Sequence, residues 1–162
     1  MTKPIILSVL LWLFIYPLHA QTAAPISFVH IGLDEGLSQS TVFDIAQDKY
    51  DNMWFATYNG LNKYDGYTFT VYQHNEKDPL SLGCDIVRSL QTDDQGRIWV
   101  GTYEGLSLYD SDKECFQNFQ YTKEGKNMPV NKIVTVNGEL LSIRMKSLSC
   151  STSARNHFPS PC

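Results

Sequence analysis

Hydrophobic and polar positions alternate over short runs in the first half of the chain, and turn-forming residues separate these runs. The runs are rich in β-branched and aromatic residues, a composition that favours strands. They lie at 41–46, 53–58, 61–64 and 67–72. Asn59 and Gly60 stand between two of the runs and predict a tight type I′ hairpin, in which both central residues have positive φ. The pattern therefore predicts one antiparallel sheet of four short strands.

The same pattern occurs a second time. From Trp54 to Trp99 is a shift of 45 positions, and this shift superimposes the two copies. Strands are expected in the second copy at 85–90, 97–103, 106–109 and 115–119. The repeated structural positions are Trp54, Thr57, Gly60, Leu61, Tyr64 and Asp65 in the first copy and Trp99, Thr102, Gly105, Leu106, Tyr109 and Asp110 in the second. Four short strands recurring at this period are typical of β-propeller blades. The predicted fold class is therefore all-β, a partial β-propeller of two four-stranded blades and the start of a third.

The first 20 residues have the layout of a secretory signal peptide: Lys3, an apolar run over 5–18, and Ala20 before a polar shift. The apolar run is shorter than the roughly 20 residues that cross a bilayer. We expect cleavage after Ala20 and export to the periplasm, with no membrane span. The expected segments are a signal peptide at 1–20, an N-terminal strand (26–31) and turn within 21–36, repeat 1 at 37–81, repeat 2 at 82–128 and the start of repeat 3 at 129–141. The tail at 142–162 is atypical and lacks periodicity, which suggests a sequence that is not native to the propeller.

Composition excludes several classes of function. A net charge of −4 leaves no basic field for a phosphate backbone, so no nucleic-acid partner is expected. The cysteines form no CxxC pair, and we predict no metal site and no cofactor. The turns at 48–52 and 92–96 are acidic but lack the bidentate Glu of an EF-hand loop, so a turn role for Asp48 and Asp93 is expected. No nucleophile elbow accompanies the histidines, and we expect no catalytic residues.

Aromatic residues are the remaining candidates for a binding site, because an aromatic face packs against the apolar face of a sugar ring. Trp54 and Trp99 occupy matching strand positions, which favours packing between blades over sugar binding. Tyr58 and Tyr103 stand beside the hairpins and are the weak candidates for ligand contacts.

The repeated stretches support a family resemblance. Residues 51–66 read Asp-Asn-Met-Trp-Phe-Ala-Thr-Tyr-Asn-Gly-Leu-Asn-Lys-Tyr-Asp-Gly, residues 78–82 read Asp-Pro-Leu-Ser-Leu, and residues 93–106 read Asp-Asp-Gln-Gly-Arg-Ile-Trp-Val-Gly-Thr-Tyr-Glu-Gly-Leu. Over 28–136 the chain resembles two-component regulator propeller repeats. These repeats form the periplasmic sensor of hybrid two-component proteins of Bacteroides-type bacteria.

The resemblance implies a sensor that binds a glycan oligosaccharide and acts as a homodimer, with kinase and DNA-binding regions elsewhere in the parent protein. This chain is then expected to be a truncated fragment without catalysis. Two alternatives stay open: a fragment of a sialidase-like, glycan-processing propeller, and a propeller that binds other proteins.

Overall fold

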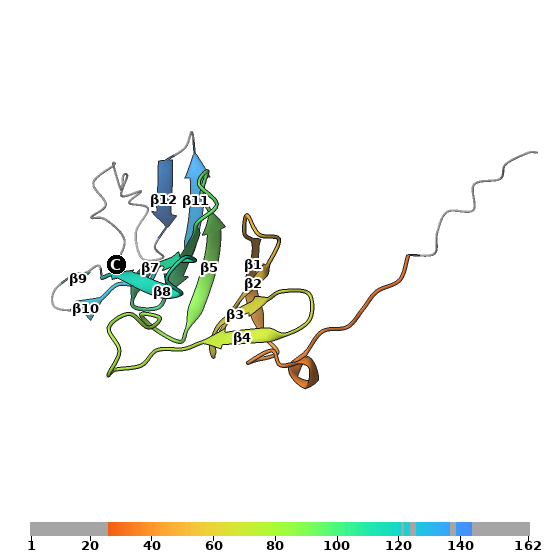
Figure 1. Ribbon diagram of the computed structural model, residues 1–162. Coiled ribbons are helices and arrows are strands. Elements are labelled where there is room, and N and C mark those ends of the chain that lie inside the picture. Colours follow the sequence, from red (N-terminus) through yellow and green to blue (C-terminus); the bar gives the residue numbers. More distant parts are fainter. Residues whose placement is uncertain (1–25, 121, 124–125, 137–138, 144–162) are drawn as a thin grey trace, which may run out of the picture. The chain divides into compact units, whose positions relative to one another are not determined.

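The computed structural model describes residues 26–120, 122–123, 126–136 and 139–143 (Figure 1). The chain divides at His30 into two units, and the strands described below belong to the second, Ile31–Cys162. The predicted signal peptide lies outside the described residues. Within the described part of the chain, no helix is both long and apolar enough to cross a membrane.

Two sheets of four antiparallel strands form the body of the second unit, which confirms the all-β, blade-like prediction. The chain enters the first sheet after a 3-10 turn, η1 (Leu33–Glu35). The first sheet contains β1 (Val42–Gln47), β2 (Met53–Thr57), β3 (Gly60–Tyr64) and β4 (Phe69–Tyr72) in that spatial order. The second contains β5 (Val87–Thr92), β6 (Ile98–Thr102), β7 (Gly105–Asp110) and β8 (Cys115–Phe119), also in sequence order. We refer to these sheets as blade 1 and blade 2.

Two smaller sheets follow. β9 (Thr122–Lys123) pairs with β10 (Lys126–Asn127), a hairpin that the pattern did not predict, and β11 (Lys132–Val136) pairs with β12 (Glu139–Ile143). The start of the third repeat is expected from the sequence over 129–141, and the observed ladder extends two residues past this boundary. The ladder with β11 continues to Ile143, which pairs with Lys132. The rest of the expected tail, 144–162, lies outside the described residues.

The strand expected over Ile26–Ile31 is not formed; these residues are irregular. An isolated extended segment has unpaired N–H and C=O groups and becomes a strand only beside a ladder partner. None of the described strands pairs with this segment. His30, interpreted from the sequence as a strand residue, is therefore in irregular, exposed chain.

The hairpin between β2 and β3 differs from the predicted type I′ turn. Thr57 pairs with Gly60, so the two loop residues are Tyr58 and Asn59. Gly60 has a φ of 96°, whereas neither loop residue is among the described residues with positive φ. The glycine is thus needed as the first residue of β3, directly after the turn. Its counterpart Gly105 follows Tyr103 and Glu104 in the same way, with a φ of 146°.

The main hydrophobic core lies between the two blades. Trp54 is fully buried, with ring centres 5.7 Å from Tyr72 and 4.8 Å from Tyr109. The phenol groups of Tyr72 and Tyr109 are hydrogen-bonded at 2.9 Å, and burial raises the pKa of both. The cluster is completed by Ala56, Leu61, Leu82, Val87, Leu90, Ile98, Val100 and Phe116. A second core contains Trp99 and its neighbours in blade 2, Leu106 and Leu108, together with Val130 and Ile133 from the start of the third repeat. Each tryptophan therefore packs toward the repeat that follows its own blade.

Polar contacts connect the first strands of the three successive repeats, which are β1, β5 and β11. Figure 1 shows β11 beside β5. The Asp44 carboxylate accepts hydrogen bonds from the Leu90 backbone N–H at 3.0 Å and from the Lys132 ammonium at 2.9 Å. The Thr92 hydroxyl donates to the Gln47 carbonyl at 2.8 Å. Asp44 thus links the three repeats. It also provides an acceptor for a backbone N–H of β5 that the ladder with β6 does not use.

Matching aspartates organise the turn before each tryptophan strand. Asp48 accepts hydrogen bonds from the backbone N–H groups of Tyr50 and Asn52, from the Asn52 amide and from the Trp54 indole N–H. Asp93 makes the same pattern, with backbone N–H groups, the Arg97 guanidinium and the Trp99 indole as donors. Burial raises the pKa of each carboxyl, but the donors outweigh it, so both pKa values lie below the ordinary Asp value. Each aspartate therefore connects its turn to a core tryptophan.

Replacing Asp48 by Asn is expected to lower the free energy of unfolding by about 1.5–3 kcal/mol at pH 7, since bonds to a charged acceptor are lost. An Asn amide also presents a donor to N–H groups that need an acceptor. Because the folded-state pKa of Asp48 is lowered, its contribution is present above the ordinary Asp pKa and disappears as pH falls through the folded-state value. Urea unfolding at pH 7 and at acidic pH measures this cost. A cost that does not shrink toward acidic pH contradicts the assignment of a charge-assisted network.

Candidate ligand-binding site

The central hairpin of each blade and the segments that enter and leave the blade lie at the same end. In blade 1, Val42 pairs with Thr57 and Leu61 with Tyr72, so the β2–β3 hairpin, the start of β1 and the end of β4 lie together. Blade 2 repeats this arrangement at its β6–β7 hairpin. We call this the loop end; the turns that hold Asp48 and Asp93 are at the opposite end.

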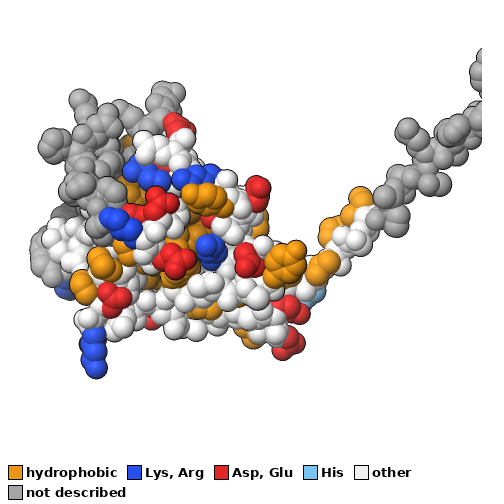
Figure 2. Space-filling view, viewed as in Figure 1, with side chains coloured by type: hydrophobic (Ala, Val, Ile, Leu, Met, Phe, Trp, Pro, Cys, Tyr) orange, Lys and Arg blue, Asp and Glu red, His pale blue; other side chains and the backbone are white. Residues whose placement is uncertain are grey.

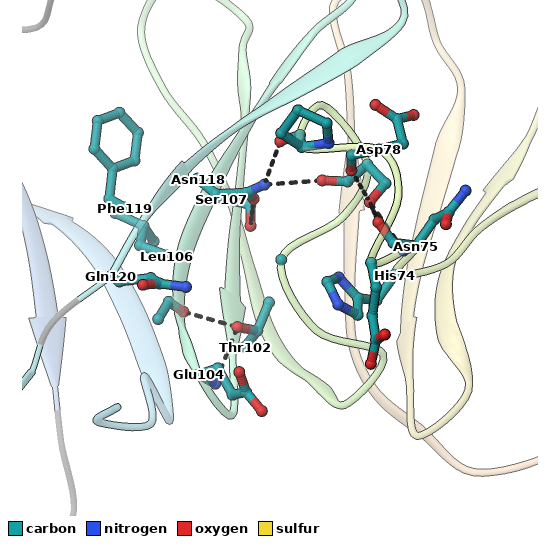
Figure 3. A pocket seen from close by; sticks show the side chains of 15 residues that line it. His74, Asn75, Asp78, Thr102, Glu104, Leu106, Ser107, Asn118, Phe119 and Gln120 are labelled. Carbon is teal, nitrogen blue, oxygen red and sulfur yellow. Dashed lines mark hydrogen bonds between the residues drawn. The ribbon is translucent and has the colours of Figure 1, made fainter. Parts of the chain in front are cut away.

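A pocket of about 330 Å³ opens at the loop end of blade 2. One wall is the linker between the blades, and the other is the β6–β7 hairpin with the end of β8 (Figure 3). Its volume is at the lower limit of typical small-molecule sites. The lining residues are His74, Asn75, Glu76, Asp78, Pro79, Ser81, Gly83, Thr102, Glu104, Gly105, Leu106, Ser107, Asn118, Phe119 and Gln120.

Hydrogen bonds attach the linker to blade 2. The Asn118 amide donates to the Ser81 carbonyl at 2.9 Å, and its own oxygen accepts from the Ser107 hydroxyl at 2.6 Å. His74 Nδ1 lies 2.9 Å from the Leu82 carbonyl oxygen, and because a carbonyl only accepts, Nδ1 carries the proton. The Asn118–Ser81 bond therefore holds the linker against blade 2, whereas the His74–Leu82 contact lies within the linker.

The pocket presents hydroxyl, amide and carboxylate groups but no Lys or Arg among its lining residues. The side chains of Glu76 and Gln120 make no hydrogen bond to any residue that the structure describes, and Glu104 accepts one from Asn127 at 3.2 Å. The Phe119 ring packs against Trp99, so it belongs to the core. The pocket can therefore accept and donate hydrogen bonds to an uncharged, hydroxyl-rich ligand.

The two tyrosines that the sequence singled out are both at the loop end. Tyr58 is 45% exposed and Tyr103 is 49% exposed. Neither lines the pocket, although Thr102 and Glu104, on either side of Tyr103, both do. Tyr58 instead packs edge-to-face against Phe43, with ring centres 4.6 Å apart.

The repeated positions lie in the scaffold. Thr57 and Thr102 are buried, and each hydroxyl donates to the carbonyl of the glycine that follows the hairpin, Gly60 or Gly105. Asp65 and Asp110 accept hydrogen bonds from backbone N–H groups two and three residues ahead. The other repeated positions are Leu61, Leu106 and Tyr109, which are buried, and Tyr64, which packs against Phe69.

Sequence reasoning missed the pocket residues His74, Glu104 and Asn118. A signal is available in β7, where the polar residue Ser107 lies between two leucines, and in β8, where Asn118 is also polar. Ser107 is 1% exposed, and a buried hydroxyl at this position requires a partner. That requirement points to Asn118 and, through it, to the linker.

Charge is distributed evenly on the visible face. Figure 2 shows acidic and basic side chains interspersed with hydrophobic ones over the described residues. Across the described part of the chain, no three His, Cys, Asp or Glu residues are grouped as metal ligands would be. The site is thus best described by its hydrogen-bonding groups.

Comparison with known proteins agrees with the geometry. Residues 36–59 and 81–104 match the family model described as a two-component regulator propeller. Over these two segments the chain is similar to two-component regulator propeller repeats. The two matched segments start 45 residues apart, as the internal repeat does.

The similar proteins are named as a histidine kinase and as the extracellular domain of a hybrid two-component system. The chain is 52% identical over 48 residues to a protein named Histidine kinase P4 from Formosa agariphila, covering 30% of this chain and 4% of the relative. It is similar to the extracellular domain of BT3049 from B. thetaiotaomicron, assigned to a hybrid two-component system, with 30% identity and a TM-score of 0.62. That match covers 70% of this chain and 17% of the solved chain.

The extracellular domain of BT4673 from the same organism shares the fold, with 17% identity and a TM-score of 0.55. The match covers 75% of this chain and 18% of the solved one. The chain therefore spans a small part of each protein it resembles.

Proposed function

We propose that this chain is part of the periplasmic ligand-sensing propeller of a hybrid two-component signalling protein, and that its ligand is a glycan oligosaccharide. The observation that supports the proposal is the loop-end pocket, which offers hydrogen-bonding side chains. Of its lining residues, Thr102, Gly105 and Leu106 are repeated positions, and the others lie outside that set. Sugars are bound mainly through hydroxyl groups, and carboxylate and amide side chains are suitable partners for them.

The proposed role is recognition without turnover. In the parent protein, ligand binding at the propeller would favour one arrangement of a homodimer and so alter kinase activity. A ligand can shift such an equilibrium only by its difference in affinity for the two states. The pocket is compatible with this role because one wall is the linker between the blades, so a bound ligand contacts the linker as well as blade 2.

A panel of neutral oligosaccharides tests binding and catalysis together. The purified chain is heated with each sugar, and released reducing ends are measured in parallel. A ligand present at 100 times its Kd is expected to add about 2.7 kcal/mol to the free energy of unfolding. We expect stabilisation by at least one sugar and no product. Product release would support the glycan-processing alternative, and no stabilisation by any sugar would contradict the proposal.

Matched variants locate the binding. Gln120→Ala removes a pocket side chain that has no hydrogen bond to a described residue, whereas Gln95→Ala removes an exposed side chain at the opposite end of blade 2. We expect the first to reduce the stabilisation by sugar and the second to leave it unchanged. An equal effect of both variants would count against the pocket.

A further inference from the structure

Matching β-bulges interrupt the first strand of each blade. In β1, Val42 pairs with Thr57 and Asp44 with Ala56, which leaves Phe43 as the extra residue. In β5, the same shift leaves Arg88 as the extra residue, 45 positions later. A bulge redirects the side chain of its extra residue, and bulges are frequent next to binding sites.

The redirected side chains meet at the loop end. The Arg88 guanidinium carbon is 5.4 Å from the Phe43 ring centre and 5.7 Å from the Tyr58 ring centre. Phe43 is 37% exposed and Tyr58 is 45% exposed. A cation above two partly exposed aromatic rings, supplied by both blades, therefore lies on the surface.

The charge of Arg88 is not balanced within the described residues. Arg97, which also lies over an aromatic ring, is paired with Asp93 at 2.7 Å. Arg88 makes neither an ion pair nor a hydrogen bond with any residue that the structure describes, and its Nε is buried without a partner. Asp44 follows Phe43 on β1, but its carboxylate is bonded to Leu90 and Lys132.

The terminal nitrogens of Arg88 are the groups that a ligand can reach. Of this guanidinium, only Nε is both buried and unbonded, so the two Nη atoms retain some contact with solvent. A guanidinium fork matches the geometry of a carboxylate, which it binds through two parallel hydrogen bonds. The adjacent rings of Phe43 and Tyr58 offer an apolar surface for the face of a sugar ring.

We propose that Phe43, Tyr58 and Arg88 form a subsite for a carboxylate-bearing sugar unit, a uronate, within an oligosaccharide. The inference rests on the proposed sensing function, because it takes the ligand to be a saccharide. It adds an acidic unit that the pocket, whose lining has no Lys or Arg, is not equipped to bind. The uronate carboxylate accepts hydrogen bonds from Arg88, and its pyranose ring lies against the two aromatic rings.

Three probes of similar length test the subsite by equilibrium binding to the purified chain: a galacturonate oligosaccharide, a sulfated galactan oligosaccharide and a neutral cello-oligosaccharide. We expect the galacturonate probe to bind most tightly. Arg88→Gln should weaken that binding by about tenfold or more, as expected for loss of a charge-assisted bidentate contact, and leave neutral sugars unaffected. Arg88→Lys should restore only part of it, because an ammonium lacks the planar fork.

Lys49→Gln is the matched control. This substitution also removes a positive charge that lies over an aromatic ring, in this case the ring of Tyr50, but it does so at the opposite end of blade 1. Tyr58→Ala, at an exposed position, is the second test if Arg88→Gln does not fold, and it should also weaken galacturonate binding. Equal losses for Arg88→Gln and Lys49→Gln overturn the subsite.

A preference for the sulfated probe overturns the carboxylate assignment. Binding of neutral sugars without any preference for galacturonate overturns the subsite and leaves the sensing function intact. Absence of binding to every sugar overturns both.

Discussion

Trp54→Ala is expected to lower the free energy of unfolding by about 3–5 kcal/mol, the range for truncating a large buried aromatic side chain. Trp54 is fully buried between the blades, where Tyr72, Tyr109 and residues of blade 2 surround it. The change also removes the indole N–H that donates to Asp48. Urea unfolding followed by circular dichroism measures the loss.

Tyr67→Ala is the control for this substitution, because Tyr67 is an aromatic residue that is 91% exposed. We expect its effect to be within about 0.5 kcal/mol of zero, as for ordinary surface substitutions. Trp54→Phe should be intermediate, since it keeps a ring but loses the donor to Asp48. If Trp54→Ala were as mild as Tyr67→Ala, the inter-blade core would not be the main source of stability.

Gly60→Ala is expected to be the second most damaging change. Gly60 has a φ of 96°, and an added Cβ would lie 2.4 Å from the Tyr72 carbonyl oxygen. The left-handed backbone costs a residue with a Cβ roughly 1–2 kcal/mol. Displacing the β4 backbone adds about 1–3 kcal/mol, the usual range for overpacking. The free energy of unfolding in urea measures the total.

Gly66→Ala separates the two contributions. Gly66 has a φ of 97°, almost the same as Gly60, but nothing lies within 4 Å of an added Cβ. We expect this variant to show only the backbone cost. Equal losses for Gly60→Ala and Gly66→Ala would mean that β4 moves away without penalty, contrary to a fixed hairpin geometry.

The blades could be predicted because their signal occurs twice. Trp54 and Trp99, with the glycines and aspartates that follow them, specify the same strands and turns in both copies. The predicted turn type is wrong because the sequence pattern places Asn59 and Gly60 in the loop, whereas the strand register places Gly60 in β3. Local sequence does not fix register when strand pairing shifts the loop by one residue.

The candidate site could not be predicted in the same way. The pocket wall contributed by the linker, including His74 and Asp78, has no repeated counterpart in the described chain, and its position depends on Asn118 far along the sequence. Arg88 is equally hidden, because its orientation arises from a bulge, and an alternating pattern does not reveal which strand residue is the extra one. The repeated sequence pattern predicts the strands and turns of the scaffold. The candidate site depends on the linker and on the strand bulge, which this pattern does not reveal.

Hydrogen exchange measured with and without the most stabilising sugar tests the central claim, that ligands bind at the loop end while the repeated residues form the scaffold. The account predicts slower exchange in the linker at 74–83 and in the hairpin at 102–107, both of which line the pocket. Slower exchange confined to the opposite turns, at 48–52 and 93–97, would contradict it.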